Sequence, residues 1–139
     1  MKTITGAPAR LCAVSRILVV DDEPDVAELV EIVLRADGHD VETVHSGRAA
    51  LERLAAGTYE LIVCDLHMPD VHGQAVYETI RNRPAPHPAV LFVSGYHGAD
   101  EKHEAFLREA RLPLLPKPFT VEALRRAVQG LLTAGGSSG

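Results

Sequence analysis

Short apolar runs alternate along the chain with longer segments in which apolar residues recur every three or four positions. The runs are typical of buried strands, and the longer segments are typical of amphipathic helices. The expected strands span residues 17–20, 39–44, 61–64, 89–93 and 112–115, and the expected helices begin near residues 24, 46, 73, 100 and 120. This alternation predicts a parallel sheet, and right-handed crossovers make it a doubly wound α/β fold with helices on both faces.

Residues with strong capping preferences mark where several helices begin and end. Pro24 fits the first turn of a helix, where its missing N–H costs nothing. We expect Ser46 and Thr120 to cap the helices that follow them. We expect Gly38 and Gly57 to end the first two helices, because glycine is the favoured residue just past a helix C-terminus.

Helical spacing also predicts which side chains face the core. Val26, Leu29, Val30 and Val33 recur at the spacing of one helix face, which predicts the inward side of the first helix. Tyr77 occupies a similar position in the third helix, so we assign it to the core rather than to ligand stacking. The fifth strand is short and contains Pro113, which cannot donate a backbone hydrogen bond.

Length, composition and charge narrow the class of protein. The chain has 139 residues, of which 46% are hydrophobic, and this is enough for the core of one domain. We expect a flexible N-terminal arm over residues 1–15, one domain over residues 16–133 and a flexible tail over residues 134–139. The formal net charge is −5 without a run of basic residues, which argues against nucleic acid and anionic lipid as partners.

Two further features of the sequence bear on the cellular compartment. No apolar stretch approaches the roughly 20 residues that cross a bilayer, so we expect no membrane span. The two cysteines, Cys12 and Cys64, form no disulfide framework. A reducing compartment is therefore natural, and we expect a cytoplasmic protein.

Polar residues with chemical potential follow four of the five expected strands. Asp21 and Asp22 follow the first strand, Asp65 the third, Ser94 the fourth and Lys117 the fifth. Since the carboxyl ends of parallel strands share one edge of a sheet, we expect these side chains to converge where such folds bind ligands. Each has a simpler interpretation alone, because acids favour helix N-termini and Ser-Gly or Lys-Pro pairs are common in turns. Their joint occurrence at strand ends favours a functional site.

The expected cluster has the composition of a phosphoryl site. Three close carboxylates repel one another, and a hard divalent cation such as Mg²⁺ relieves that repulsion through oxygen ligands. The cation and Lys117 would neutralise phosphoryl oxygens, and Ser94 would donate a hydrogen bond to them. One carboxylate can then act as nucleophile and form an aspartyl-phosphate. Asp65 is the better candidate because it stands alone on a central strand.

Four motifs carry a resemblance to a known family over about residues 16–132. They are Val-Val-Asp21-Asp22-Glu-Pro, Asp65-Leu-His-Met-Pro-Asp-Val-His-Gly73, Val93-Ser94-Gly95-Tyr96 and Leu115-Pro116-Lys117-Pro118-Phe119. As a set they resemble the receiver domain of two-component response regulators. The resemblance implies a flavodoxin-like sheet with strand order 2-1-3-4-5. It also implies a protein that is not an enzyme but accepts a phosphoryl group and then changes its protein contacts.

The resemblance assigns roles to individual residues. It implies that a histidine kinase or a histidine phosphotransfer protein phosphorylates Asp65. Asp22, Asp65 and the backbone carbonyl of His67 would bind Mg²⁺ directly, and Asp21 would act mainly through water. Ser94 and Lys117 would hold the phosphoryl group.

Further implications concern the peptide bond after the lysine and the surfaces used for output. The Lys117–Pro118 bond would be cis, and His67 and Tyr96 would occupy the positions that tune hydrolysis of the acyl phosphate. The last two helices and the fifth strand form the family's usual dimer face, through which a homodimer is an expected partner state. One departure is Leu114, which stands where the family usually has the aromatic ring that reports phosphorylation.

Three other functions compete with this interpretation. A phosphate sink or relay receiver of a hybrid histidine kinase would use the same residues. An aspartyl-phosphate hydrolase needs a second acid two residues after its nucleophile, where this chain has His67. A flavin or nucleotide carrier on the same fold would need a glycine-rich first loop, whereas this loop is acidic.

Overall fold

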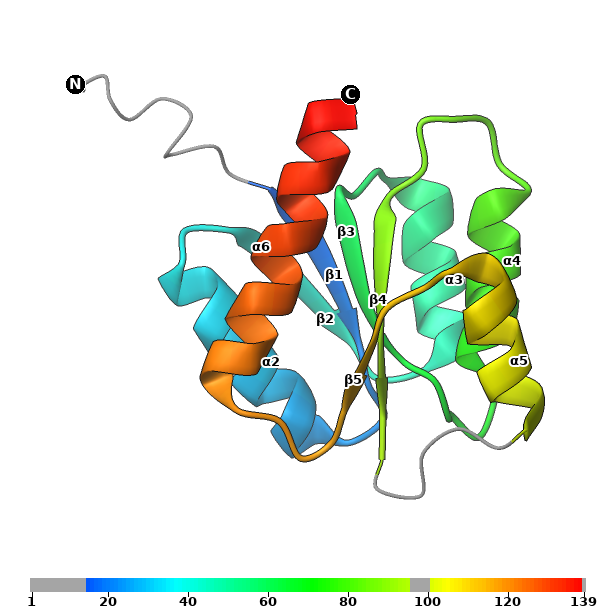
Figure 1. Ribbon diagram of the computed structural model, residues 1–139, viewed down its shortest axis with the longest axis horizontal. Coiled ribbons are helices and arrows are strands. Elements are labelled where there is room, and N and C mark those ends of the chain that lie inside the picture. The colour runs from blue at the N-terminus through cyan, green and yellow to red at the C-terminus, as the bar shows by residue number, and fades with distance from the viewer. Residues whose placement is uncertain (1–14, 96–100, 139) are drawn as a thin grey trace.

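The computed structural model describes residues 15–95 and 101–138, and it describes the side chains of 15–95 and 105–133. The predicted arm therefore lies almost entirely outside the described residues. Five strands alternate with five helices (Figure 1). The elements are β1 (Arg16–Val20), α2 (Pro24–Ala36), β2 (Asp40–Val44), α3 (Gly47–Ala56), β3 (Leu61–Asp65), α4 (Gly73–Arg81), β4 (Ala89–Ser94), α5 (Glu101–Ala110), β5 (Leu114–Pro116) and α6 (Val121–Ser138).

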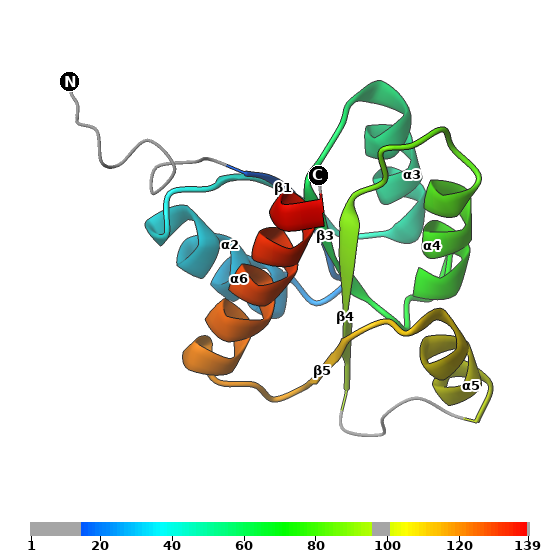
Figure 2. The same cartoon turned by 45° about the horizontal axis from the view of Figure 1, so that its top comes forward.

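The strands form one parallel sheet in the order β2-β1-β3-β4-β5. Val20 is in register with Val44 on one side and with Cys64 on the other, so Asp21, the residue after β1, is level with Asp65 at the end of β3. Helices α2 and α6 cover one face of the sheet, and α3, α4 and α5 cover the other (Figures 1 and 2). The predicted doubly wound fold and strand order are confirmed.

Alternation along the strands divides the core into two layers. On β1, Leu18 and Val20 face the layer under α3, α4 and α5, whereas Ile17 and Val19 face the layer under α2 and α6. The other central strands alternate in the same way, because successive side chains of a strand point to opposite faces of the sheet. Strand β3 is buried along its whole length. Both faces of the sheet are therefore shielded from solvent, which explains the continuous apolar runs in the sequence.

The inward face of α2 differs in part from the prediction. Ala27, Val30 and Leu34 are buried, whereas Leu29 is 40% exposed. The reason is geometric, since successive residues of a helix are about 100° apart and Leu29 is thereby turned away from the line through Val30. Tyr77, predicted as a core residue of α4, is only partly buried and packs against the core.

The predicted caps are confirmed. The Ser46 side chain accepts a hydrogen bond from the Ala49 N–H at 3.1 Å, and Thr120 Oγ1 accepts one from the Ala123 N–H at 3.0 Å. Gly38 follows α2 with a φ of +94°, a conformation that glycine adopts without steric cost.

Two elements differ by more than one residue from the predicted bounds. Strand β5 begins only at Leu114 rather than at 112, because Pro113 has no N–H to donate to the ladder. Helix α6 continues to Ser138 and so includes residues 134–138, which the sequence analysis assigns to a tail. Gly135 and Gly136 are weak helix formers, but no proline interrupts the hydrogen-bond ladder there.

The structure predicts opposite effects for two glycine-to-alanine changes. A Cβ at Gly47 would lie 2.5 Å from both Cβ and O of Val71, so Gly47→Ala should lower the free energy of unfolding by about 1–3 kcal/mol through overpacking. A Cβ at Gly130, within α6, meets nothing within 4 Å, so Gly130→Ala should raise it by about 0.5–1 kcal/mol. Urea unfolding of both variants measures the difference, and equal effects would contradict the close approach of α3 to the β3–α4 loop.

Candidate functional site

The carboxyl ends of the strands bring the predicted site residues together. Asp65 is the last residue of β3 and Ser94 the last of β4, while Asp21 and Lys117 directly follow β1 and β5. Asp21, Asp65 and Ser94 are 3%, 5% and 0% exposed, although all three are polar. This edge is thus a polar site set into the end of an apolar sheet.

Three carboxylates form the centre of the site. Asp21, Asp22 and Asp65 each offer one oxygen, and these oxygens all lie within 4.8 Å of one another. Carboxylate oxygens are the ligands that Mg²⁺ favours. Two of the acids are buried, where an unpaired carboxylate is costly. A hard divalent cation would pair with these oxygens and reduce that cost. The predicted convergence of the acids is confirmed.

Lys117 is the cation that the protein itself places among the acids. Its Nζ lies 3.0 Å from Asp21 Oδ2, 3.4 Å from Asp65 Oδ2 and 2.7 Å from Glu23 Oε1. The Lys117 N–H also donates to the Ser94 carbonyl at 2.6 Å, and the Lys117–Pro118 bond is cis, as the resemblance implies. Glu23 was not among the predicted site residues, although it continues the acidic run after β1 and precedes α2 as its N-cap.

Burial and like charge shift the titration of the acids. Burial, reinforced by the charge of Asp21, raises the pKa of Asp65 to about 7, despite opposing contributions from the His67 N–H and Lys117. Burial likewise raises the pKa of Asp21. Burial alone would lower the pKa of Lys117, but its carboxylate partners outweigh that effect and raise it. The site therefore holds a firmly charged lysine beside carboxylates that resist ionisation without added positive charge.

Ser94 stands out because its hydroxyl has no partner. Its Oγ is the one buried side-chain nitrogen or oxygen without a hydrogen bond among residues whose side chains the structure describes. Leaving such a group unsatisfied is costly. A buried hydroxyl at the end of β4, next to the acids and Lys117, is therefore a donor available to a ligand.

Backbone contacts hold the segment that follows Asp65. The His67 N–H donates to Asp65 Oδ1 at 3.1 Å, which orients the carboxylate. The Gly73 N–H donates to the Leu66 carbonyl at 3.1 Å, and a Cβ at Gly73 would lie 2.8 Å from the Asp65 carbonyl oxygen. Only glycine therefore permits this close return of the chain. The role of the His67 carbonyl as a metal ligand stays a prediction.

Asp70 fastens the same segment to a neighbouring helix. Its carboxylate accepts hydrogen bonds from the N–H groups of Gly47 at 3.1 Å and Arg48 at 2.9 Å, the first residues of α3. Such bonds satisfy N–H groups that a helix leaves unpaired at its start. This role of Asp70 is not predicted from the sequence, because a cap supplied from 23 positions along the chain leaves no local signal.

The remaining predicted residues have separate outcomes. Position 114, where the resemblance leads one to expect an aromatic ring, is a leucine on β5 that is 37% exposed. Tyr96 lies outside the described residues, and its predicted role is untested.

Comparison with known proteins gives a consistent result. The family model for the response regulator receiver domain matches residues 17–129. The response regulator protein FleR of Pseudomonas aeruginosa is 34% identical over 110 residues, which cover 79% of this chain and 23% of FleR. The transcriptional regulatory protein TcrA of Mycobacterium tuberculosis is 33% identical over 131 residues, which cover 92% of this chain and 51% of TcrA. The chain thus spans about a quarter to a half of these relatives.

Solved structures show the same architecture. The receiver domain of a LuxO repressor protein from Vibrio parahaemolyticus aligns with a TM-score of 0.80 at 24% identity, covering 91% of this chain and 95% of that one. A CheY-like receiver domain protein from Methanospirillum hungatei aligns with a TM-score of 0.82 at 23% identity, covering 91% and 100%. At these identities the alignments support the fold alone. None of the described helices is both long and apolar enough to cross a membrane.

The Asp70 cap predicts a pH-dependent contribution to stability. Hydrogen bonds from the backbone, first from Arg48, hold the pKa of Asp70 below its usual 3.8. A lowered folded-state pKa stabilises the fold above the unfolded-state pKa, and that stabilisation is lost as the pH falls through the folded-state value. Asp70→Asn should therefore lower the unfolding temperature at neutral pH, and the difference from wild type should shrink below about pH 4.

The control is Glu52→Gln, which removes the same charge from an exposed position of α3. Thermal unfolding of the three proteins between acidic and neutral pH measures the effect. A pH-independent difference for Asp70→Asn, or an equal one for Glu52→Gln, would contradict a cap made by the Asp70 carboxylate.

Proposed function

Because the chain belongs to the response regulator receiver domain family, we propose that Asp65 accepts a phosphoryl group from the phosphohistidine of a histidine kinase or phosphotransfer protein. The observation that carries the proposal is the grouping of a buried nucleophile, a lysine and an unpartnered hydroxyl at one edge of the sheet. We further propose that the protein acts in the cytoplasm, as a switch for protein contacts rather than as an enzyme.

The transfer forms one bond and breaks another. A carboxylate oxygen of Asp65 attacks phosphorus, the phosphorus–nitrogen bond breaks, and the leaving imidazole nitrogen keeps the electron pair and takes up a proton. A bound Mg²⁺ would neutralise charge on the carboxylates and the phosphoryl oxygens. Asp22, Asp65 and the His67 carbonyl would hold the ion, with Asp21 acting through water. Nearby positive charge also favours the ionised, nucleophilic form of Asp65.

Lys117 and Ser94 respond to the new group. Before transfer, Lys117 is shared among three carboxylates, of which Asp65 is the most distant at 3.4 Å. A phosphoryl group on Asp65 adds negative charge on that side, so Lys117 is drawn toward it. The Ser94 hydroxyl gains the acceptor that it lacks. Ser94 ends β4 and Lys117 follows β5, the two strands nearest the α5 edge of the sheet, which gives the switch a route to that surface.

The output of this switch differs in one respect from the family's usual arrangement. The aromatic position is occupied by Leu114, so no ring can move inward from β5 when Ser94 shifts. We propose that the backbone of β5 and the flanking helices carries the change instead. The face formed by α5, β5 and α6 is the proposed surface for homodimer contacts.

Replacing the nucleophile tests the chemistry directly. Wild-type protein with Mg²⁺ and acetyl phosphate should gain one phosphoryl group that hydroxylamine removes, because an acyl phosphate is labile to that nucleophile. Asp65→Asn should gain none, since an amide oxygen is a poor nucleophile. Intact-mass spectrometry measures both, and a chelator should abolish the wild-type adduct.

Asp25→Asn is the matched control for this experiment, because Asp25 is exposed in the first turn of α2 and outside the cluster. It should be phosphorylated like wild type. A full adduct on Asp65→Asn would overturn the assignment of the nucleophile, and undiminished transfer in the presence of chelator would overturn the metal requirement.

Replacing Lys117 tests the switch separately from the chemistry. In Lys117→Ala, phosphorylation should change far fewer amide NMR signals than in wild type, because no lysine is left to pair with the new negative charge. The two proteins are compared at the same extent of phosphorylation, measured by mass. Arg126→Ala, which removes an exposed cation from α6, should respond like wild type. An unaltered spectral response in Lys117→Ala would show that the lysine does not transmit the change.

A further inference from the structure

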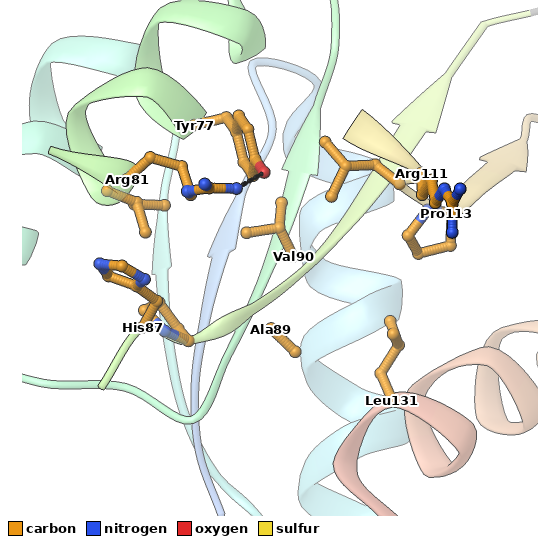
Figure 3. Close-up of a pocket in the computed structure, with 11 residues that line it drawn as sticks. Tyr77, Arg81, His87, Ala89, Val90, Arg111, Pro113 and Leu131 are labelled. Carbon is orange, nitrogen blue, oxygen red and sulfur yellow. Dashed lines mark hydrogen bonds between the residues drawn. The ribbon is translucent and has the colours of Figure 1, made fainter. Parts of the chain in front are cut away.

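A pocket lies at the opposite end of β4 from Ser94. It has a volume of about 350 Å³, and its floor and walls include the first residues of β4 together with parts of α4, α6 and the α5–β5 loop (Figure 3). Ile80, Val90 and Leu131 contribute apolar surface to it. A volume of this size is at the lower end of the range for small-molecule sites. The pocket shares no residue with the acidic site at the other edge of the sheet.

The lining of this pocket carries more positive than negative charge. Arg81 and Arg111 line it, and no carboxylate is among its described lining residues. The chain as a whole has a formal net charge of −5. A local excess of cationic groups over an apolar floor, in an acidic protein, favours a ligand with one anionic and one apolar part.

Arg81 is held in place by its neighbours. Its Nη1 donates to Tyr77 Oη at 2.9 Å, as Figure 3 shows. The Tyr77 ring in turn packs edge-on against Phe106 and Phe92, with ring centroids 5.4 Å and 6.4 Å away. The guanidinium is therefore positioned before any ligand binds, which reduces the entropy lost on binding.

Arg111 occupies a backbone position that favours glycine. Helices α2 and α5 end with the same hydrogen-bond pattern, from the His39 N–H to the Leu34 carbonyl and from the Leu112 N–H to the Leu107 carbonyl. In α2 the left-handed residue of this motif is Gly38, as is usual. In α5 it is Arg111, the only described non-glycine residue with a positive φ, at +56°. The fold would favour glycine here, but the side chain present is a cation on the pocket wall.

The backbone of β4 adds a donor and an acceptor. The Ala89 N–H bonds toward β3, to Glu60, and the Phe92 N–H bonds toward β5, to Pro113. By alternation, the N–H and carbonyl of Val90 face the β5 side, but β5 begins only opposite Phe92. No loop backbone or side chain in the described part of the chain hydrogen-bonds to Val90. Its peptide groups therefore face the pocket as an unpaired strand edge.

From these features we infer that the pocket binds a carboxylate carried on a small apolar group. The carboxylate binds Arg111 through charge-assisted hydrogen bonds, and Arg81 adds positive charge from the other side of the pocket (Figure 3). The apolar part covers Val90 and Leu131. A ligand with an amide next to its carboxylate, such as an acylated amino acid or a peptide C-terminus, also pairs with the peptide groups of Val90.

N-acetyl-leucine is the probe that combines these groups. Titrated into the full chain, it should shift amide NMR signals of Val90, Arg81 and the α5–β5 loop in a saturable way. N-acetyl-leucinamide, which has the same shape without the charge, should bind at least about ten-fold more weakly, the scale of one lost charge-assisted hydrogen bond. Hexanoate carries the carboxylate and an apolar chain but no amide. If the Val90 peptide groups bind the ligand, hexanoate should therefore bind more weakly than N-acetyl-leucine.

Arg111→Gly is the decisive variant, because it separates binding from folding. It should raise the unfolding temperature by relieving the left-handed arginine, yet weaken N-acetyl-leucine binding by about ten-fold or more. Arg108→Ala, which removes an exposed cation of α5 outside the pocket, should leave the affinity unchanged. Both variants should keep phosphorylation at Asp65, so this test does not depend on the proposed function.

Several results would overturn the assignment. They are equal binding of N-acetyl-leucine and its amide, unchanged affinity in Arg111→Gly, signal shifts confined to other surfaces, and no saturable binding of either carboxylate. Loss of affinity in Arg108→Ala to the same degree as in Arg111→Gly would also overturn it, because the effect would then reflect net charge alone.

Discussion

The structure depends on holding three like charges at the buried end of a sheet. Burial and the charge of Asp21 raise the pKa of Asp65 to about 7, and burial also raises the pKa of Asp21. Lys117 partly relieves this strain, because its Nζ lies within 3.4 Å of a carboxylate oxygen from each of them. The relief is incomplete, so added positive charge at this edge of the sheet would stabilise the ionised acids further. Burying these carboxylates so close together costs stability, and a bound cation would reduce that cost.

Asp21 and Asp65 stay close together because the strands that carry them are packed into the core on both sides. The register of β1 and β3 places Asp21 level with Asp65, and the apolar side chains of both strands are buried on both faces, so the two acids cannot move apart without opening the core. The segment after Asp65 is tied back through Gly73 and, by Asp70, to the start of α3. In contrast, Lys117 follows a strand of only three residues at the edge of the sheet. The acids therefore lie on packed central strands, whereas Lys117 follows the short strand at the edge of the sheet.

Sequence patterns predicted the fold and most of the acidic site for one shared reason. Apolar runs fix which segments are strands, and parallel strands place every residue that follows them at one edge. Asp21, Asp65 and Lys117 were therefore identifiable without coordinates. Glu23 and Asp70 were missed because their partners lie 94 and 23 positions away, a separation on which helical or strand periodicity carries no information.

The pocket at the far end of β4 was missed for a related reason. The pocket exists because β5 begins only at Leu114, after Pro113, and leaves the edge beside Val90 uncovered. A single proline thus has two effects: it shortens the strand that leads to Lys117, and it exposes peptide groups at the other end of the neighbouring strand. Arg111 then lies beside this gap in a conformation that glycine would adopt more easily. Arginine is unfavourable in this left-handed conformation, so its presence beside the uncovered strand edge does not serve folding. Binding of a ligand by its side chain explains it better.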